Sequence, residues 1–453
     1  MKTPNDIEKI YELSLIWREA KYNFAFWDKL DIDWDDEYKN ALISILEQET
    51  LYDYYRELKR FINLLNDGHT DVGFPGEIMQ DTEYFSMLPI YLAKVGEEFI
   101  VVATSETLKD EIPMFSSLVK IDGTDINDYI KEKCYPYIWH ANEDACGMAV
   151  AGDIVFGKKG SKNLYTFSKD GTDFEIILEK VEPSGIKWRE MGANSQSLVE
   201  TRQIGKSETC EIGITDDGIA IIKMTSFADD TMPQMIYSCF DELKDAKGYI
   251  LDVRGNSGGN SSNSDAIAAM FIEGEFYSCF AESQIYEPTY KAWSMFREDF
   301  KGLAVDEALQ KYADDQYSLK SYCMQKNIYY VKDEGEEATH NVPGKLSGPI
   351  VVLMNQYTFS AAEDFVDVMK KYTDAVFVGN NTAGSSGQPL VVGLESGGFF
   401  RICTRRCIAQ NGEDIYNKGF APDVKIIPSV KDVISGHDVV LENALDIIKN
   451  RTT

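Results

Sequence analysis

The chain has 453 residues, 44% of them apolar, and a formal net charge of −30 from 45 basic and 75 acidic side chains. This length predicts two or three domains with cores of ordinary composition. So acidic a surface repels phosphate backbones and anionic membranes, which argues against nucleic-acid and lipid-surface roles. No apolar run approaches the ~20 residues that span a bilayer.

The N-terminal sequence and the cysteines bear on the compartment. Met1-Lys-Thr-Pro-Asn-Asp-Ile-Glu-Lys-Ile lacks the apolar core of a secretory signal. The eight cysteines are scattered without a Cys-x-x-Cys pair. The nearest two, Cys403 and Cys407, flank two arginines and do not have the form of a metal knuckle. We therefore expect a cytoplasmic protein with reduced thiols, an expectation that a removed signal segment would overturn.

Residues 1–80 have the periodicity of a small helical domain. Thr3 followed by Pro4 predicts a helix start, with Thr3 as the N-cap. Apolar residues then recur at alternating three- and four-residue steps, at Ile10, Leu13, Trp17, Ala20, Phe24 and Trp27. We predict a second helix over 36–47 and a third that begins at Thr50 and ends before the stop signal Asn66-Asp-Gly.

Residues 81–182 predict a β domain with one or two helices. Runs of β-favouring residues separated by turn residues lie at 88–93, 98–103, 117–121 and 173–178. Ile121-Asp-Gly predicts a tight turn into a short helix that starts near Ile126. The polar residues that follow, 183–215, predict a connection containing a strand or two.

Residues 183–453 predict an α/β domain, because strands and helices alternate from residue 219 onwards. We expect strands at 219–224, 249–254, 350–354 and 376–379, and helices at 231–243, 263–271, from Ser360 onwards, and at 441–449. The mostly helical and polar residues 287–343 interrupt this alternation and are predicted to be an insertion. In such folds, functional groups lie on loops at strand ends.

A serine follows the strand predicted at 350–354. Ser360 and Glu363 have capping-box spacing, which places the serine at the N-terminus of a helix. There the helix dipole and free N–H groups favour a developing negative charge. The same spacing is also that of an ordinary N-cap, so this stretch alone does not distinguish a nucleophile from a cap.

Two further loops have the composition of a reactive site. Asp252-Val-Arg-Gly-Asn-Ser-Gly-Gly259 places paired glycines after a strand, where backbone N–H groups can approach an oxyanion. Such a loop can equally bind phosphate or simply turn. His69, one of four histidines, immediately follows the helix-stopping Gly68 and can also be an ordinary loop residue.

Taken together, these loops resemble family S41 of serine peptidases, which includes the C-terminal processing (tail-specific) proteases and a tricorn-core-like branch. The matching stretches are Asn66-Asp-Gly-His69-Thr, Ile250-Leu-Asp-Val-Arg-Gly-Asn-Ser-Gly-Gly259, Thr358-Phe-Ser360-Ala-Ala-Glu363, Val378-Gly-Asn-Asn-Thr382-Ala-Gly384 and Gly419-Phe-Ala-Pro-Asp423. The order of these five stretches and their approximate separation also agree with those of the family, so the resemblance spans nearly the whole chain. It implies an α/β multidomain protein with an N-terminal helical domain (1–80), a PDZ-like β domain (81–182) and a crotonase-like (ClpP/crotonase) α/β catalytic domain (183–453).

By position, the resemblance implies that Ser360 is the nucleophile. The oxyanion hole would combine the N–H of Ala361 with that of Gly258 or Gly259. Four other matching residues are expected to be structural: Asp252, Arg254, Asn256 and Glu363.

The resemblance leaves two possibilities for the base. One branch of the family uses a lysine in a Thr-Phe-Gly-Lys motif, but this chain has Ser385 there, and a hydroxyl cannot act as a base near neutral pH. The other branch uses a histidine that His69 matches, and imidazole has a suitable pKa, so His69 is the expected general base. In that branch a serine before the histidine and a late glutamate orient the ring. Here Gly68 takes the serine's position, and Glu413 and Asp414 are the nearest possible orienting carboxylates.

These features predict a serine peptidase that hydrolyses peptides or unfolded C-terminal protein segments through an acyl-enzyme. Neither a metal nor a cofactor is expected, because no histidine–carboxylate cluster has ligand spacing and the glycine loop is not a Walker motif. One alternative is a non-catalytic peptide- or small-ligand-binding protein that keeps this architecture. A weaker one is a crotonase-like enzyme acting on acyl-thioesters. The oligomeric state is not indicated.

Overall fold

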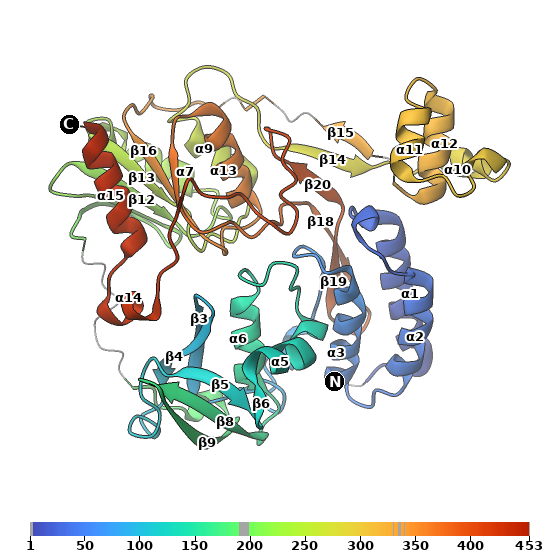
Figure 1. Cartoon of the computed structure of the whole chain (residues 1–453), viewed down its shortest axis with the longest axis horizontal. Coiled ribbons are helices and arrows are strands. Elements are labelled where there is room, and N and C mark those ends of the chain that lie inside the picture. Colours follow the sequence, from blue (N-terminus) through green and yellow to red (C-terminus); the bar gives the residue numbers. More distant parts are fainter. Residues whose placement is uncertain (1–2, 190–198, 329, 334–336, 339, 453) are drawn as a thin grey trace.

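The computed structural model describes residues 3–189, 199–328, 330–333, 337, 338 and 340–452. Two predicted segments fall partly outside these residues: 190–198 belong to the predicted connection, and 329, 334–336 and 339 belong to the predicted insertion. The chain forms a mixed α/β structure with several sheets (Figure 1).

The largest sheet has seven strands in the order β10-β11-β12-β13-β16-β17-β21, parallel from β12 onwards. The strands are β10 (Arg202–Lys206), β11 (Cys210–Ile214), β12 (Ile219–Met224), β13 (Gly248–Asp252), β16 (Ile350–Met354), β17 (Val376–Gly379) and β21 (Val424–Lys425). Its helices are α7 (Met232–Ser238), α8 (Phe240–Leu243), α9 (Ser261–Ala268), α13 (Ala361–Tyr372), α14 (Val430–Ser435) and α15 (Val439–Thr452). The predicted strands at 219–224 and 350–354 are confirmed with these bounds. The helix predicted over 231–243 is wrong as a single element, because the chain leaves helical geometry at Cys239.

Helices cover both faces of this sheet. Leu251 and Val352 pack in one core with α7, α9 and α13, whereas their neighbours Ile250 and Val351 pack in a second core with α15. Figure 1 shows α15 on one side of β12, β13 and β16 and α9 and α13 on the other. A strand buried on both faces needs a continuous apolar run rather than an alternating one, which β13 and β16 have. Because β13 and β16 are adjacent and parallel, the loops that follow them lie side by side.

Residues 86–179 form a separate antiparallel sheet with its own core. Its strands are β3 (Ile90–Val95), β4 (Glu98–Thr104), β5 (Ser117–Ile121), β6 (Thr124–Asp125), β8 (Lys162–Lys169) and β9 (Thr172–Glu179), beside the small pair β2 (Ser86–Met87) and β7 (Phe156–Gly157). Its helices are α5 (Ile126–Tyr129), a π-helical turn (Ile130–Cys134) and α6 (Gly147–Val155). The four predicted strands are present within two residues. Strand β8 and helix α6 were missed.

The N-terminal helices do not enclose a core of their own. The helices are α1 (Asp6–Asn23), α2 (Trp34–Leu46), α3 (Leu51–Ile62) and, after β1, the short α4 (Gly76–Met79). A small antiparallel sheet beside them contains β1 (Asp71–Gly73), β18 (Pro389–Gly393) and β19 (Phe399–Cys403). Apolar side chains of α1–α3 share one core with Val72, Phe400 and Ile402. The N-terminal and C-terminal thirds of the chain are therefore packed together.

Helix α1 begins at a different residue from the one predicted. Asn5, not Thr3, is the N-cap: its side chain accepts hydrogen bonds from the N–H groups of Ile7 and Glu8, and the carboxylate of Glu8 accepts one from the N–H of Asn5. This reciprocal pair satisfies more free N–H groups than Thr3 could, which explains the later start. Thr50 caps α3 as predicted.

The region 288–326 is helical and packs around its own small core. It contains α10 (Pro288–Ser294), α11 (Val305–Lys311) and α12 (Gln316–Lys326), and it is joined to the rest by the sheet β15-β14-β20 (Tyr330–Asp333, Phe280–Gln284 and Arg405–Ile408). Figure 1 shows these helices at the edge of the molecule, next to α1. Asn327 donates from Nδ2 to the carbonyl oxygen of Lys21, 2.5 Å away.

Among the described residues, no helix combines the length and apolar character needed to cross a membrane.

A buried carboxylate joins α1 to the β18–β19 hairpin. Glu12 accepts hydrogen bonds from the hydroxyl of Tyr54 (2.6 Å), the N–H of Ser396 (2.7 Å) and the hydroxyl of Ser396 (2.7 Å).

We expect Tyr54→Phe to lower the free energy of unfolding by about 1.5–3 kcal/mol, because the buried carboxylate of Glu12 then loses a hydrogen-bond donor. Chemical denaturation measures this loss. The exposed Tyr11 on the same helix is the control: Tyr11→Phe should change stability by less than about 0.5 kcal/mol. Equal effects of the two variants would contradict a special role for the buried contact.

Candidate active site

Ser360 lies in the turn between β16 and α13 with a strained backbone. Its φ of 56° and ψ of −128° are unusual for a residue with a side chain, and such conformations cost on the order of 1–3 kcal/mol. The hydroxyl of Thr358 donates to the carbonyl oxygen of Val253 (2.9 Å) and so fixes the turn to the end of β13. A strained strand–turn–helix presents a serine hydroxyl at the edge of a sheet.

The predicted capping box at Ser360 is wrong. Ser360 is the N-cap residue of α13, but its hydroxyl makes no capping hydrogen bond. Glu363 does not return to the N–H of Ser360, which instead donates to the carbonyl oxygen of Ser385 (3.1 Å). Both side chains are therefore directed to other partners.

One of these partners is His69, which follows α3 and is almost fully buried (3% exposed). The backbone N–H of His69 donates to Oδ2 of Asp67 (3.0 Å), and its ring stacks on Phe359 with centroids 4.5 Å apart. Its Nε2 lies 3.0 Å from Oγ of Ser360, and its Nδ1 lies 2.7 Å from Oγ of Ser385. The structure thus brings together two predicted site residues that are 291 positions apart in the chain.

The environment of His69 favours the neutral ring. Burial, together with the positive charge of Arg401, lowers the pKa of His69 to about 3. A neutral imidazole has one donor and one acceptor nitrogen. When Nδ1–H donates to Ser385, Nε2 is free to accept the proton of Ser360. This is the protonation state that a general base requires.

Glu363 holds the loop that carries Ser385. Its fully buried carboxyl group accepts hydrogen bonds from the hydroxyl of Thr382 (2.5 Å) and from the N–H groups of Gly384 (2.8 Å) and Ser385 (2.8 Å). Burial raises the pKa of Glu363 to about 7, and these three donors oppose that rise. Glu363 therefore has a structural role, as expected: it fixes Ser385, the residue that contacts Nδ1 of His69.

The two carboxylates considered as orienting groups lie elsewhere. Asp414 forms an ion pair with Lys29, with 2.9 Å between Oδ2 and Nζ, and Glu413 is exposed. The nitrogen that they were expected to orient contacts Ser385 instead. Sequence reasoning identified the loop of Ser385, because the family's other branch has its lysine there. It could not show that a serine hydroxyl in this loop would reach the imidazole.

Of the backbone groups expected in the oxyanion hole, the N–H of Gly258 is already engaged. It donates to Oδ1 of Asn256 (2.9 Å). Within the described part of the chain, no acceptor is found for the N–H groups of Gly259 and Ala361. A Cβ at Gly258 would lie 2.6 Å from Cβ of Ser360 and 2.9 Å from the nitrogen of Ala361. The space next to the serine is open only because residue 258 is glycine.

An ion-pair network fixes the end of β13 below this loop. Arg254 donates to both carboxylate oxygens of Asp252 (2.9 and 2.7 Å) and also pairs with Asp438 (2.7 Å). Asn256 donates from Nδ2 to the carbonyl oxygen of Met224 (3.1 Å). These contacts explain why the sequence has charged and amide side chains at this strand end.

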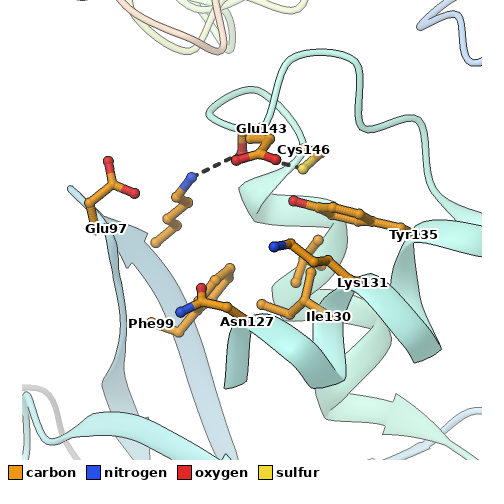
Figure 2. A pocket seen from close by; sticks show the side chains of 10 residues that line it. Glu97, Phe99, Asn127, Ile130, Lys131, Tyr135, Glu143 and Cys146 are labelled. Atoms are coloured by element: carbon orange, nitrogen blue, oxygen red, sulfur yellow. Dashed lines mark hydrogen bonds between the residues drawn. The ribbon is translucent and has the colours of Figure 1, made fainter. Parts of the chain in front are cut away.

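Of two cavities, one borders this site and the other lies apart from it. One of 150 Å³ borders Asp67, Gly68, Trp139 and Arg401, on the segment that carries His69. The other, of 310 Å³, lies in the middle sheet region (Figure 2). Figure 2 shows Phe99 and Ile130 low in this pocket, with Lys131, Tyr135 and Glu143 around it. The one described group of three side chains suited to hold a metal ion does not include His69.

Comparison with known proteins identifies the family of the region around Ser360. Residues 218–426 match peptidase family S41. The carboxy-terminal processing protease CtpA of Bacillus subtilis is 25% identical over 259 residues, which cover 57% of this chain and 43% of that protein. The carboxyl-terminal-processing peptidase 3, chloroplastic, of Arabidopsis thaliana is 23% identical over 224 residues, covering 49% and 34% respectively. The matched region thus spans less than half the length of either curated relative.

The similarity in fold to a solved structure covers more of the chain than the family match over residues 218–426. Mature CPAF, solved in complex with lactacystin, superposes with a TM-score of 0.70 over 99% of each chain, at 17% sequence identity. At this identity the match shows a shared fold, and it includes the N-terminal segment with His69. Residues 218–426 of this chain are therefore similar to peptidase family S41, and the chain is similar in sequence to C-terminal processing proteases.

Proposed function

We propose that the protein is a serine peptidase in which Ser360 is the nucleophile and His69 the general base. The observation that carries the proposal is the 3.0 Å separation of Ser360 Oγ and His69 Nε2. This is within the reach expected of a nucleophile and its base. The family S41 match of the surrounding residues supports the same reaction class.

In the proposed mechanism, Ser360 Oγ attacks the scissile carbonyl carbon while Nε2 of His69 takes the hydroxyl proton. The negative charge that forms on the carbonyl oxygen is stabilised by the N–H of Ala361 and the N–H of Gly259. The imidazolium then returns the proton to the leaving amine, which gives the acyl-enzyme and the first product. Water, activated in turn by His69, releases the second product.

Ser385 is the proposed orienting group for His69. Its hydroxyl accepts Nδ1–H, so it fixes the ring and its tautomer as a carboxylate does in other triads. A neutral hydroxyl stabilises the imidazolium less than a carboxylate would. Glu363 accepts hydrogen bonds from the N–H groups of Gly384 and Ser385 and so holds Ser385 in its position next to His69.

We infer that the substrate is a peptide or an unfolded C-terminal segment of a protein, as the names of the curated relatives describe for those proteins. In this proposal, residues 81–182 correspond to a PDZ-like domain and 183–453 to a crotonase-like catalytic domain. The free thiols of the eight cysteines fit a reducing, cytoplasmic compartment. The alternative, a non-catalytic binding protein, would need neither the strained Ser360 nor its contact with His69.

The first test is covalent labelling of the nucleophile. Wild-type protein should react with a fluorophosphonate probe, and Ser360→Ala should lose both labelling and peptidase activity, by roughly 10³–10⁶-fold in kcat. Ser238→Ala, which alters an exposed serine of α7, should behave as wild type. A folded wild-type protein that the probe does not label would favour the binding-protein alternative.

The second test concerns the protonation state of the base. Because burial and Arg401 lower the pKa of His69 to about 3, proton uptake is expected only far below the ordinary imidazole pKa of ~6.5. With ¹⁵N-labelled histidine, NMR should show a neutral, Nδ1-protonated ring at position 69 from pH 5 to pH 8. The control is the same protein unfolded in urea, where this ring should titrate normally. A native His69 that gains its proton near the ordinary value would contradict the proposed environment.

Between the folded and unfolded pKa values of His69, the unfolded chain binds a proton that the folded chain does not. The free energy of unfolding should therefore fall as the pH is lowered through this range. The contribution of His69 to stability is complete above about pH 6.5, the unfolded value, and is lost as the pH falls towards the folded pKa of about 3.

The third test concerns Ser385. Ser385→Ala should lower kcat by less than the ~10²–10⁴-fold that a general acid–base group contributes, because the base itself remains. The same variant should lose the preference for the Nδ1-protonated tautomer in the ¹⁵N spectrum. Ser238→Ala is again the matched control. Unchanged kcat together with an unchanged tautomer would remove Ser385 from the mechanism.

A further inference from the structure

Three potential metal ligands from different elements converge on one face of α13. They are Cys279, just before β14, Cys407 in β20, and Asp364 in the first turn of α13. The two sulfur atoms and a carboxylate oxygen all lie within 4.8 Å of one another. Among the described residues, this is the one such group of three. None of its members takes part in the proposed peptidase mechanism.

The register of two strands places the thiols on the same side. Strand β14 pairs with β20 so that Phe280 is opposite Ile408 and Ala281 is opposite Cys407. Cys279 and Cys407 are therefore diagonal neighbours on one face of the ladder. Diagonal positions are ~7–8 Å apart, whereas disulfides prefer Cα atoms ~5.5–6 Å apart. Both thiols are free, and a metal ion between them suits this spacing better than a disulfide does.

The carboxylate is already oriented by neighbouring hydroxyl groups. Asp364 is 6% exposed. It accepts hydrogen bonds from Ser261 Oγ on Oδ2 (2.8 Å) and from Ser386 Oγ on Oδ1 (2.7 Å). Carboxylates that ligate metals are commonly held in this way by outer partners.

A cavity of 330 Å³ opens next to these ligands and gives access to them. It is lined by Cys279, Asp364, Asp265 and His340, among others. Asp265 is buried, and its Oδ1 has no hydrogen-bond partner among the described residues. Arg405 also lines the cavity, and its Nη2 donates to the carbonyl oxygen of Cys279 (3.4 Å). Two buried acids and two thiols thus share the region with one guanidinium group.

We propose that Cys279, Cys407 and Asp364 bind a zinc ion, with the fourth position open to the cavity, where water or His340 completes the tetrahedron. Two thiolates and one carboxylate form a ligand set typical of zinc, and thiolates disfavour magnesium and calcium. The sequence predicted no metal site, because Cys403 and Cys407 lack knuckle spacing. The proposed ligands come instead from three distant segments. The metal has no part in the peptide hydrolysis, and through Asp364 and Ser386 it would stabilise the loop next to Ser385.

The test is metal binding by the full-length reduced chain. Zinc titrated against a chromophoric chelator should bind with a stoichiometry of one ion per chain. Cobalt should produce the near-ultraviolet charge-transfer band of thiolate ligation and should protect two thiols from a disulfide reagent. Cys407→Ser, at a partly exposed position, should abolish the band. Ser261→Ala should weaken binding by roughly 10–100-fold, the effect of losing an outer partner.

Cys146→Ser, which alters a buried cysteine in the pocket of Figure 2, is the matched control and should bind zinc as wild type does. Zinc should also raise the Tm of wild type and of this control but not that of Cys407→Ser. Absence of the cobalt band in wild type would overturn the proposal. Equal zinc affinity in wild type and Cys407→Ser would do so as well. Circular dichroism verifies that each variant is folded.

Discussion

The candidate active site depends on the pairing of β1 with β19. Asp71, Val72 and Gly73 pair with Arg401, Phe400 and Phe399, so the segment after α3 is held against the C-terminal third of the chain. The shared apolar core of α1–α3 and the β18–β19 hairpin stabilises this pairing. His69 is two residues before β1, and this is why a residue near the N-terminus can reach the turn after β16. Loss of this packing would separate the base from the nucleophile without altering either residue.

The buried carboxyl group of Glu363 is the second constraint on the site, and its burial is energetically unfavourable. Burying a carboxyl group without a cationic partner is unfavourable, and burial raises the pKa of Glu363 to about 7. Three donors from residues 382–385 compensate, and in return the carboxyl group fixes the loop that contacts His69. The position of Glu363 in the first turn of α13 adds the favourable field of the helix N-terminus. A neutral side chain of the same shape could not hold three donors equally well.

The sequence predicted the elements with strong local signals and missed those defined by tertiary contacts. The apolar runs of β12 and β16 and the cap at Thr50 were identified with correct bounds, because burial and capping leave a local pattern. Ser360 and His69 could be selected from motifs. The partner of Nδ1 could not, because it depends on how the loop at Ser385 folds over α13. Similarly, the Oδ1 atom of Asn256 engages the N–H of Gly258, a contact that leaves no trace in residue spacing.

The neighbouring acids Glu363 and Asp364 connect the two sites that we propose. Glu363 binds residues 382, 384 and 385, whereas Asp364 binds the hydroxyl of Ser386 and also belongs to the proposed zinc site. Consecutive residues of one helix turn thus hold consecutive residues of one loop. A metal ion bound to Asp364 would therefore help to hold Ser386, and with it the loop in which Glu363 binds the N–H of Ser385.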